Sequence, residues 1–446
     1  MMRAEPMRRA TIVGMVALAL AAAGCGATGG GDQGDTVSAG SRPTTVESGG
    51  RRQAVGQPPS GLGLNWFSSG RPSSPLASPA ATAPPATDPP YSGAGPAFLG
   101  AGPHAPRAAG PATPGDAPSL QPGPLGAMTG RISPAVADFP VRVYVPNSDA
   151  HTLTVIDPET FRIVATYSTS WVPHHVTPSW DMTKLYVNNT SGNQLTVIDP
   201  ATAKPVETIN VIDPYNLYFT PDGSKAIVVA ERLQRLDFRD PKTWALIKSV
   251  PIPGSGVDHL DFSADGRYLI ASCEFSGHVV KVDTETMAVA GSMYVGGLPI
   301  DVKMSPDGSV FYVTNQGRHG VHVIDPETMK ELAFLPTGTG AHGLNYSRDT
   351  KRLFVSNRLG GSISVIDPET RTVTATWRTG RSPDMLQVST DGSQIWVSNR
   401  FHGSVSVIDA DDGTVIRTIA TGAGAHGVSI FPQPGRFSVG HNGVYR

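Results

Sequence analysis

The stretch Val323-Ile324-Asp325-Pro326 decides the fold, because it returns along the chain at a nearly constant interval. The other clear copies are Val155-Ile156-Asp157-Pro158, Val197-Ile198-Asp199-Pro200 and Val365-Ile366-Asp367-Pro368. Weaker copies of the same phrase centre on Asp240, Asp283 and Asp409. Consecutive aspartates of this series lie 41 to 43 residues apart. Self-similarity at this period is typical of a repeat architecture.

Each repeat contains four short segments with the composition of β-strands. In the unit that ends near Asp367, these segments are residues 344–347, 352–357, 362–366 and 372–377. They are rich in β-branched and aromatic residues, whereas Gly, Asp, Asn and Pro fill the connections between them. Four antiparallel strands in about 42 residues predict one blade of a β-propeller. The sequence therefore predicts an all-β, seven-bladed propeller.

The two ends of the repeat region predict how the ring closes. The first unit begins at its second strand, residues 141–145, and its missing first strand is found at residues 427–431. We expect these segments to share one blade, which removes a free sheet edge. Residues 437–446 are similar to the start of another second strand, and the repeat pattern gives them no place.

Two polar residues recur in a way that indicates a structural role. The repeated Asp opens a tight turn, where its carboxylate can accept backbone N–H bonds, and the Pro that often follows presets the turn. Ten positions earlier, an Asn recurs at residues 147, 189, 315, 357 and 399. Asn tolerates left-handed backbone conformations and can bond to the turn that it begins. We therefore assign both residues to the scaffold.

The chain begins with the pattern of a secretory signal. Arg3, Arg8 and Arg9 precede an apolar run from Thr11 to Ala23, which is too short to span a bilayer as a stable helix. The run ends in Ala22-Ala23-Gly24-Cys25, which resembles a bacterial lipobox. The resemblance implies a lipoprotein signal peptide over residues 1–24 and lipidation of Cys25; an ordinary secretory signal is the alternative. Either pattern places the mature protein outside the cytoplasm.

Residues 25–138 are predicted to be a disordered linker. The segment is rich in Pro, Gly, Ala, Ser and Thr, a composition that cannot form a packed core. A flexible chain of this length has a mean end-to-end distance of roughly 60 Å. The propeller, over residues 139–446, could therefore be held away from a membrane surface.

The repeats resemble a known family. Tyr312-Val313-Thr314-Asn315, followed by Val323-Ile324-Asp325-Pro326, is similar to the YVTN β-propeller repeat. Variants of the first phrase stand at residues 185–189, 354–357 and 396–399. The resemblance covers residues 139–446 and implies a secreted or surface-exposed bacterial propeller. Because unrelated activities share this fold, it implies no particular reaction.

Function on a repeat scaffold is expected where the repeats differ. The loop that leads into each first strand should lie beside the central channel, and two neighbouring positions there collect histidine, aspartate and tyrosine. We predict a ligand-binding channel mouth formed by His174, His175, Tyr215, Asp258, His259, Asp301, His342, Asp384 and His426. Arg358 and Arg400, from the loops after the second strands, lie on the same face and could hold an anionic group; solvated loop charges are the alternative.

Histidines that converge on an axis also suit a divalent metal, for which His174, His259, His342 and His426 are the candidates. No His-x-x-x-His sequence or cysteine cluster supports a metal independently, and a water-filled funnel lined by polar residues would show the same pattern. No catalytic residue is assigned, and the cofactor is left open.

The sequence supports three classes of function. The first is a lipid-anchored extracytoplasmic scaffold that binds a small ligand or a protein at the channel mouth. The second is a metal-dependent or lactonase-like enzyme that uses the His/Asp ring, and the third is a structural protein of the cell envelope. The formal net charge of −2 gives no indication of a nucleic-acid partner.

Overall fold

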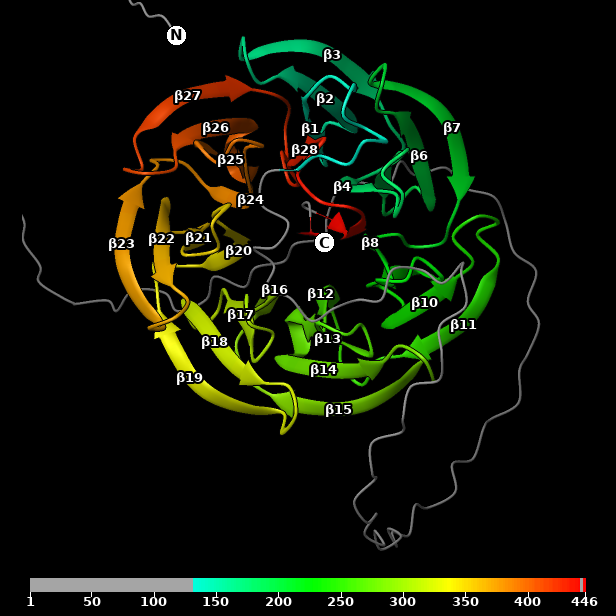
Figure 1. The fold of residues 1–446 in the computed structure, drawn as a ribbon, viewed down its shortest axis with the longest axis vertical. Coiled ribbons are helices and arrows are strands. Elements are labelled where there is room, and N and C mark those ends of the chain that lie inside the picture. The colour runs from blue at the N-terminus through cyan, green and yellow to red at the C-terminus, as the bar shows by residue number, and fades with distance from the viewer. Residues whose placement is uncertain (1–130, 442–443) are drawn as a thin grey trace, which may run out of the picture. The chain divides into compact units, whose positions relative to one another are not determined.

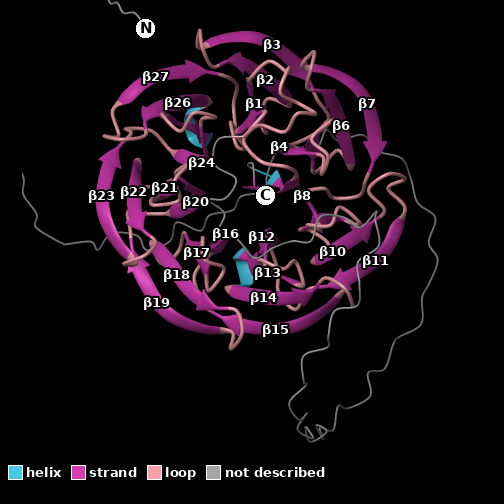
Figure 2. Cartoon of the chain, in the orientation of Figure 1, coloured by secondary structure: helices cyan, strands magenta, loops and turns pink. Residues whose placement is uncertain are grey.

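The computed structural model describes residues 131–441 and 444–446, and these form a β-propeller of seven blades. The blades are arranged in a ring, each with its first strand at the centre and its fourth at the rim (Figure 1). Figure 2 shows that strands make up nearly all of the regular structure. The predicted all-β, seven-bladed fold is confirmed.

The innermost strands line the centre of the ring. In chain order they are β4 (Pro173–Pro178), β8 (Asn216–Phe219), β12 (Val257–Phe262), β16 (Pro299–Met304), β20 (Ala341–Tyr346), β24 (Pro383–Val388) and β28 (Ser429–Phe431). The second strands are β1 (Arg142–Asn147), β5 (Leu185–Asn189), β9 (Ala226–Ala230), β13 (Tyr268–Cys273), β17 (Phe311–Asn315), β21 (Leu353–Asn357) and β25 (Gln394–Asn399).

The third and fourth strands complete each blade toward the rim. The third strands are β2 (Thr152–Asp157), β6 (Gln194–Asp199), β10 (Arg235–Arg239), β14 (His278–Asp283), β18 (Gly320–Asp325), β22 (Ser362–Asp367) and β26 (Ser404–Asp409). The fourth strands are β3 (Arg162–Ser168), β7 (Lys204–Asn210), β11 (Leu246–Pro251), β15 (Ala288–Tyr294), β19 (Lys330–Pro336), β23 (Thr372–Arg378) and β27 (Val415–Ala420). The 3₁₀ turns η2 (Glu274–Ser276) and η3 (Arg400–His402) follow two of the second strands.

Apolar side chains between neighbouring blades hold the ring together. The second and third strands are buried along most of their length, whereas the fourth strands are largely exposed. Seven clusters of buried apolar residues occur in the described part of the chain, each joining two adjacent blades. Burial of this kind stabilises by about 25 cal/mol per Å² of apolar surface. A single blade has two apolar faces, so it is stable only between neighbours.

The ring closes as predicted. Strand β28, from the end of the chain, pairs with β1, from its start, in the sheet order β28-β1-β2-β3. The pairing joins Val143 to Ile430 and Tyr144 to Ser429. Because both ends of the repeat region share one blade, the ring has no open edge at this position.

The repeated Asp has the predicted role. In the turn after β22, Asp367 Oδ1 accepts the backbone N–H of Glu369 at 2.8 Å, and Asp157 makes the same bond to Glu159 at 3.0 Å. The other repeats show equivalent bonds. Each carboxylate therefore satisfies backbone donors that the tight turn leaves unpaired.

The repeated Asn is part of the scaffold, and Asn315 accepts the N–H of Arg318 in the turn that it begins, as predicted, but the expected left-handed backbone is wrong. These residues end the second strands, and none of them has a positive φ. Instead, the side chain reaches across to the third strand: Asn357 Nδ2 donates to the hydroxyls of Ser362 and Ser364, each at 3.0 Å. Asn is therefore selected for a buried amide between two strands, and not for its tolerance of left-handed backbone.

The residues after Phe437 form a hairpin at the centre of the ring. Strands β29 (Ser438–Gly440) and β30 (Val444–Tyr445) extend the third blade inward, in the order β11-β10-β9-β8-β29-β30. The C-terminus lies at the middle of the ring in Figure 1. The similarity of this segment to a second strand was misleading: the ring is already complete, so the tail adds to the free side of an innermost strand.

Contacts at its base hold this C-terminal hairpin. Phe437 stacks on Trp180 with ring centroids 5.5 Å apart, and Arg446 donates to Asp261 Oδ1 at 3.0 Å. Gly440 pairs with Tyr218 of β8, and a Cβ at this glycine would lie 2.2 Å from the tyrosine ring. Only glycine allows the hairpin to approach β8 this closely.

Within the described residues, no helix has the length and apolar character needed to cross a membrane. The predicted signal peptide, Cys25 and nearly all of the predicted linker lie outside the residues that the structure describes.

Candidate functional site

The two neighbouring positions singled out in the sequence lie in β-bulges of the innermost strands. In β4, Pro173 pairs with Asn189 and Val176 pairs with Val187, so His174 and His175 together oppose one residue of β5. The same irregularity occurs in β12, β16, β20 and β24. A bulge changes the direction of the side chains that it contains. Both positions can therefore contribute side chains to the centre of the ring.

A hydroxyl group opposite the bulge fixes it in several blades. Thr314 of β17 accepts the N–H of Asp301 at 2.8 Å and donates to the carbonyl of His342 in the next blade at 2.5 Å. Ser272, Ser356 and Ser398 make equivalent bonds to the residue at the corresponding position of the next blade. These hydroxyls hold the bulges of neighbouring blades in register, and so they position the side chains at the centre.

One side of this central site is cationic. Arg358, whose side chain is 11% exposed, donates from Nε to Asp384 Oδ1 at 2.9 Å and from Nη1 to Gln316 at 3.2 Å. His342 lies between these groups: its Nδ1 is 3.0 Å from Asp384 Oδ1, and its Nε2 contacts the Arg358 guanidinium. Only the contact with Arg358 is a hydrogen bond, since Nδ1 is buried without a hydrogen-bond partner among the described residues. Burial raises the pKa of Asp384, and the two neighbouring arginines, Arg358 and Arg400, oppose that shift.

Arg400 belongs to the same cationic side but has fewer partners. Burial lowers the pKa of its guanidinium, and Asp384 opposes this shift. Its Nη1 atom is buried without a hydrogen-bond partner among the described residues. Asp384 is bound to Arg358 and acts on Arg400 only through its charge, so two guanidinium groups face one carboxylate on this side of the ring. We refer to Arg358, Arg400, His342, Asp384 and His426 as the cationic side.

The opposite side carries three carboxyl groups, Asp258, Glu231 and Glu274, which we call the acidic side. Burial, followed by the negative charge of neighbouring carboxylates, raises the pKa of Glu231 to about 8 and that of Glu274 to about 7. Burial likewise raises the pKa of Asp258 to about 8. Near neutral pH Glu231 and Asp258 are therefore mostly protonated and Glu274 is about half protonated, and a protonated carboxyl group can donate a hydrogen bond.

Aromatic rings connect the two sides. His426 Nε2 lies 3.8 Å from Asp384 Oδ2, and the His426 and His174 rings are 4.7 Å apart. His174 in turn contacts Tyr215 at 4.9 Å and bonds through Nδ1 to the hydroxyl of Thr190 at 2.7 Å. The rings therefore form a continuous row from the cationic side to Tyr215, whose hydroxyl has a raised pKa because it is buried.

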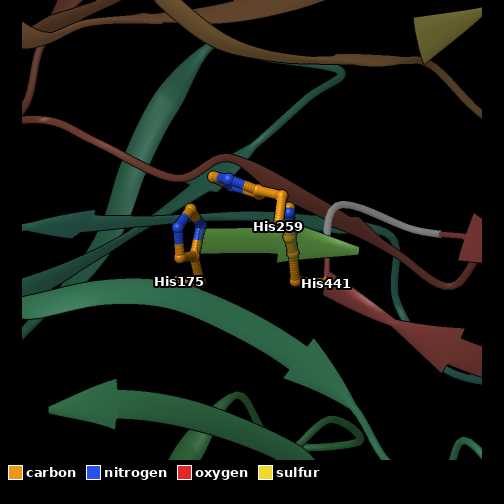
Figure 3. A group of neighbouring side chains, drawn as sticks. All are labelled: His175, His259 and His441. Carbon is orange, nitrogen blue, oxygen red and sulfur yellow. The ribbon is translucent and has the colours of Figure 1, made fainter. Parts of the chain in front are cut away.

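A separate group of three histidines meets beside this row: His175 from β4, His259 from β12 and His441 after β29 (Figure 3). One ring nitrogen of each lies within 4.8 Å of the others. The His175 and His441 rings are stacked at 4.5 Å, and the His259 and His441 rings meet edge to face at 4.5 Å. We call these residues the inner histidine cluster. All three side chains are fully buried.

Burial keeps these imidazoles neutral. It is the largest cause that lowers the pKa of His259 to about 4, and it lowers the pKa values of His175 and His441 well below the usual range. His259 Nδ1 lies 2.8 Å from Asp258 Oδ1, although the angle is poor for a hydrogen bond. The neutral ring is the form of histidine that binds metals.

The structure brings most of the predicted residues together, but it distributes them differently from the prediction. His342, Asp384, Arg358, Arg400 and His426 form one group, and His174 and Tyr215 connect it to the acidic side. Asp301 stands apart, because its carboxylate accepts the backbone N–H groups of Val302 at 2.9 Å and Leu344 at 2.8 Å. The carboxylate of Asp301 is therefore part of the scaffold.

Two expectations need correction. The alternative of a water-filled funnel predicts exposed polar side chains, whereas His342, Asp384 and His426 are almost entirely buried and the C-terminal hairpin lies at the centre. The alternative of solvated charges also fails for Arg358, which is bound to Asp384. Of the four metal candidates, His259 belongs to the only metal-type group found among the described residues, whereas His174, His342 and His426 do not.

The sequence reasoning missed His441. This residue lies outside the repeats and comes to the centre only through the C-terminal hairpin. A local signal was present: Phe437, Val439 and His441 alternate with other residues, and Asn442-Gly443 is a dipeptide typical of two-residue hairpin loops. Nothing in the repeat pattern, however, indicated which strand such a hairpin would join.

Comparisons with known proteins identify the fold family and little more. The YNCE-like beta-propeller family model matches residues 108–436. No protein of curated function matches the sequence.

Solved structures with the same fold have diverse descriptions. Kuenenia stuttgartiensis hydrazine synthase is 20% identical, with a TM-score of 0.56 over 65% of this chain and 96% of that one. The dihydro-heme d1 dehydrogenase NirN is 18% identical, with a TM-score of 0.52 over 69% of this chain and 78% of that one. A "putative 6-phosphogluconolactonase" of Bacteroides uniformis is 15% identical, with a TM-score of 0.56 over 65% of this chain and 99% of that one. At these identities the similarity concerns the fold alone.

Proposed function

This chain belongs to the YNCE-like beta-propeller family, and from that premise we propose that it is a binding protein whose central site takes a small polar ligand or a protruding group of a protein partner. The ligand carries an anionic group, a carboxylate or a phosphate ester, that binds at the cationic side. Its hydroxyl groups face the acidic side. The protein acts outside the cytoplasm, held at a membrane by a lipid on Cys25.

The observation that carries this proposal is the uneven charge of the cationic side. Arg358 is bound to the carboxylate of Asp384, which is the nearby negative charge that acts most strongly on Arg400, and Nη1 of Arg400 is buried without a partner among the described residues. A buried guanidinium that lacks a partner is costly, because it has lost water without gaining hydrogen bonds. An anionic group placed beside Arg400 would satisfy it, and guanidinium groups bind carboxylates and phosphates with matched geometry.

The acidic side favours a ligand with hydroxyl groups. Glu231 and Glu274 have raised pKa values, so near neutral pH each carboxyl group can both donate and accept a hydrogen bond. Such groups suit the hydroxyls of a polyol better than a second anion. Together the two sides fit a sugar acid or a sugar phosphate.

The test measures binding of D-gluconate and 6-phosphogluconate to the purified full chain by calorimetry, with uncharged glucose for comparison. We expect the two anions to bind and glucose to bind at least tenfold more weakly. The Arg400→Ala variant should lose most of the affinity for the anions. Arg378→Ala, which removes an exposed arginine at the end of β23, serves as the matched control and should bind like the parent chain.

Equal binding by Arg400→Ala and the parent chain would contradict the assignment of the cationic side. Absence of binding by both anions would contradict the proposed ligand class. If clustered replacement of the central residues also left every cellular phenotype unchanged, the structural role in the cell envelope would be favoured.

The membrane anchor is a separate part of the proposal, supported by the sequence Ala22-Ala23-Gly24-Cys25. Two acyl chains suffice for stable attachment, since each buried CH₂ contributes about 0.8 kcal/mol. We expect labelled palmitate to be incorporated into the expressed protein and Cys25→Ala to abolish labelling and release the protein from membranes. Labelling that survives this change would refute lipidation at Cys25.

One contact favours an enzyme as the second candidate. His342 Nδ1 lies 3.0 Å from Asp384 Oδ1, and a rotation of the ring would turn this contact into a hydrogen bond. A histidine that is oriented by a carboxylate is a common general base. A hydrolase acting on lactones, the activity named for the Bacteroides uniformis protein, would be consistent with this pair. Turnover of glucono-δ-lactone, with and without added Zn²⁺, distinguishes this candidate from simple binding: it predicts hydrolysis that His342→Gln abolishes, whereas a binding protein shows no hydrolysis above the spontaneous rate.

A further inference from the structure

The inner histidine cluster leaves buried polar atoms without protein partners. None of the six ring nitrogens of His175, His259 and His441 has a hydrogen-bond partner among the described residues. Each unpaired buried polar atom costs about 1–3 kcal/mol. Three apolar side chains would fill the same volume without that cost, so simple packing does not account for the choice of histidine.

We propose that His175, His259 and His441 form a binding site for one late transition-metal ion of the Zn²⁺ or Cu²⁺ class. The site joins three separate parts of the fold, which are β4, β12 and the C-terminal hairpin. It is distinct from the cationic side, where the anionic ligand is proposed to bind.

The spacing of the nitrogens is close to that of a metal site. The three ligand atoms lie within 4.8 Å of one another. In a tetrahedral site with Zn–N bonds of about 2.1 Å, the nitrogens are separated by about 3.4 Å. A rotation of each side chain that moves its ring nitrogen by roughly 1 Å toward the others would bring the three nitrogens to this separation. Three protein ligands would leave one coordination position for water or a ligand atom.

The donor atoms determine the class of metal. All three ligands are imidazole nitrogens, which suit zinc, copper and nickel, whereas Ca²⁺ and Mg²⁺ require oxygen ligands. Cys273, a free cysteine, is not part of the group, and burial raises the pKa of its thiol to about 12. A site without thiolate and with three neutral ligands therefore favours Zn²⁺ or Cu²⁺ over softer ions.

A neighbouring carboxyl oxygen lies where it can orient one of the three rings. Asp258 Oδ1 lies 2.8 Å from His259 Nδ1, which leaves Nε2 as the ring nitrogen that faces no carboxylate. Histidines that bind metals commonly present their second nitrogen to an acceptor oxygen, which fixes the tautomer and orients the ring. A carboxyl group retains such an acceptor oxygen whether or not it is protonated. The angle between the two groups is poor for a hydrogen bond in this structure, and the ring rotation that metal binding requires would align Nδ1–H with Asp258 Oδ1. Asp258 is thus proposed as a positioning residue for His259, and it does not itself bind the ion.

Metal binding should also hold the C-terminal hairpin in place. The hairpin pairs with β8 at one position, Gly440 with Tyr218, and its other described contacts are concentrated at its base. His441 follows directly after β29 and contacts residues of two other blades. A metal at this position would fasten the inner end of the hairpin to β4 and β12.

The experiment uses the full chain, stripped with a chelator and then dialysed separately against Zn²⁺, Cu²⁺ or Ca²⁺. We expect one equivalent of zinc or copper and no calcium, measured by elemental analysis. The Cu²⁺ form should show electron paramagnetic resonance splitting from nitrogen ligands. Zinc should raise the melting temperature and slow hydrogen exchange in residues 437–446.

Three variants separate a metal site from packed aromatic rings. His441→Gln should lose the metal while the ring stays folded, because this residue lies outside the seven blades. Asp258→Asn should retain the metal with affinity reduced about 10–100-fold. His402→Ala, which removes an exposed histidine that bonds to Ser382, is the control and should bind metal like the parent chain.

Two results would overturn the proposal. One is a parent chain that retains neither zinc nor copper after dialysis, which would leave the cluster as a packed group of rings. The other is stoichiometric metal that His441→Gln does not remove, which would place the ion elsewhere. If His441→Gln fails to fold, the nitrogen splitting and the hydrogen-exchange response of the parent chain still decide between these outcomes.

Discussion

At the scale of single residues, the centre of the ring is notable for ionisable groups held out of water. Glu231 illustrates the consequence. Its pKa is raised to about 8, first by burial and then by the charges of Asp258, Glu274 and Asp213, while Arg232 opposes the shift. A carboxyl group whose pKa is higher in the folded state than in the unfolded state binds its proton more tightly when the protein is folded.

This shift predicts how stability depends on pH. Between about pH 4.5 and pH 8 the folded state retains a proton that the unfolded state has lost, so the contribution of Glu231 to stability falls as the pH rises through this range. The Glu231→Gln variant cannot ionise. We expect it to gain melting temperature relative to the parent chain at pH 8.5 and to show little difference at pH 5.

Thermal unfolding followed by circular dichroism at both pH values tests this prediction. Glu369→Gln, in an exposed turn, is the control and should show the same difference from the parent chain at both pH values. An equal effect of Glu231→Gln at pH 5 and pH 8.5 would show that this carboxyl group is already ionised at the lower pH.

At the scale of elements, the repeated phrase encodes more than a strand. Thr314, the third residue of Tyr312-Val313-Thr314-Asn315, bonds to the bulge of β16 and to the carbonyl of His342 in the next blade. Asn315 follows it and bonds to His322 of the third strand. One residue therefore connects neighbouring blades and the next connects neighbouring strands, which explains why polar side chains recur inside a buried strand.

The bridging hydroxyl predicts a measurable cost. Thr314→Val preserves the shape of the side chain but leaves the N–H of Asp301 and the carbonyl of His342 without this partner. We expect a loss of about 1–3 kcal/mol in the free energy of unfolding. Thr372→Val, on the exposed strand β23, should change it by no more than about 0.5 kcal/mol.

Chemical denaturation of the two variants and the parent chain gives the comparison. A Thr314→Val chain as stable as the Thr372→Val chain would mean that the hydroxyl bridges contribute nothing to the register of the blades.

The sequence predicted these elements well but not their irregularities. The seven copies of the aspartate phrase predicted the number of blades. In the unit that ends at Asp367, the predicted strand boundaries differ from those of the structure by three residues at most, at the start of β20. The bulge at His174 and His175 could not be predicted, because alternation of polar and apolar residues does not show where a strand gains an extra residue. The left-handed backbone predicted for Asn357 was wrong, because the hydrogen bonds of its side chain depend on the neighbouring strand.

At the scale of the whole molecule, two segments near the C-terminus have different roles. Strand β28 completes the ring by pairing with β1, whereas the C-terminal hairpin adds to β8 at the centre. The first could be predicted from a missing repeat element. The second could not, because residues 437–446 have no counterpart in the repeats and their position depends on the finished ring.

These roles predict different effects of truncation. A chain that ends at residue 436 retains all seven blades and should unfold cooperatively, with a lower melting temperature. A chain that ends at residue 426 lacks β28, exposes the edge of β1 and loses Val428, Ile430 and Phe431 from two apolar clusters. We expect this shorter chain to aggregate or to lose cooperative unfolding.

Size-exclusion chromatography and thermal unfolding of both truncated chains provide the measurement. A soluble, cooperatively folded chain ending at residue 426 would show that the pairing of β28 with β1 is not needed to close the ring.

The order of synthesis gives this arrangement a further meaning. A polypeptide is made from its N-terminus, so β1 remains without its partner until β28 has been made, and the hairpin that carries His441 follows β28. A polypeptide that stops before residue 427 would therefore lack both β28, which closes the ring, and His441, the third residue of the inner histidine cluster. Residues 427–446 thus link closure of the ring to completion of the proposed metal site, because β28 and His441 both belong to this one segment.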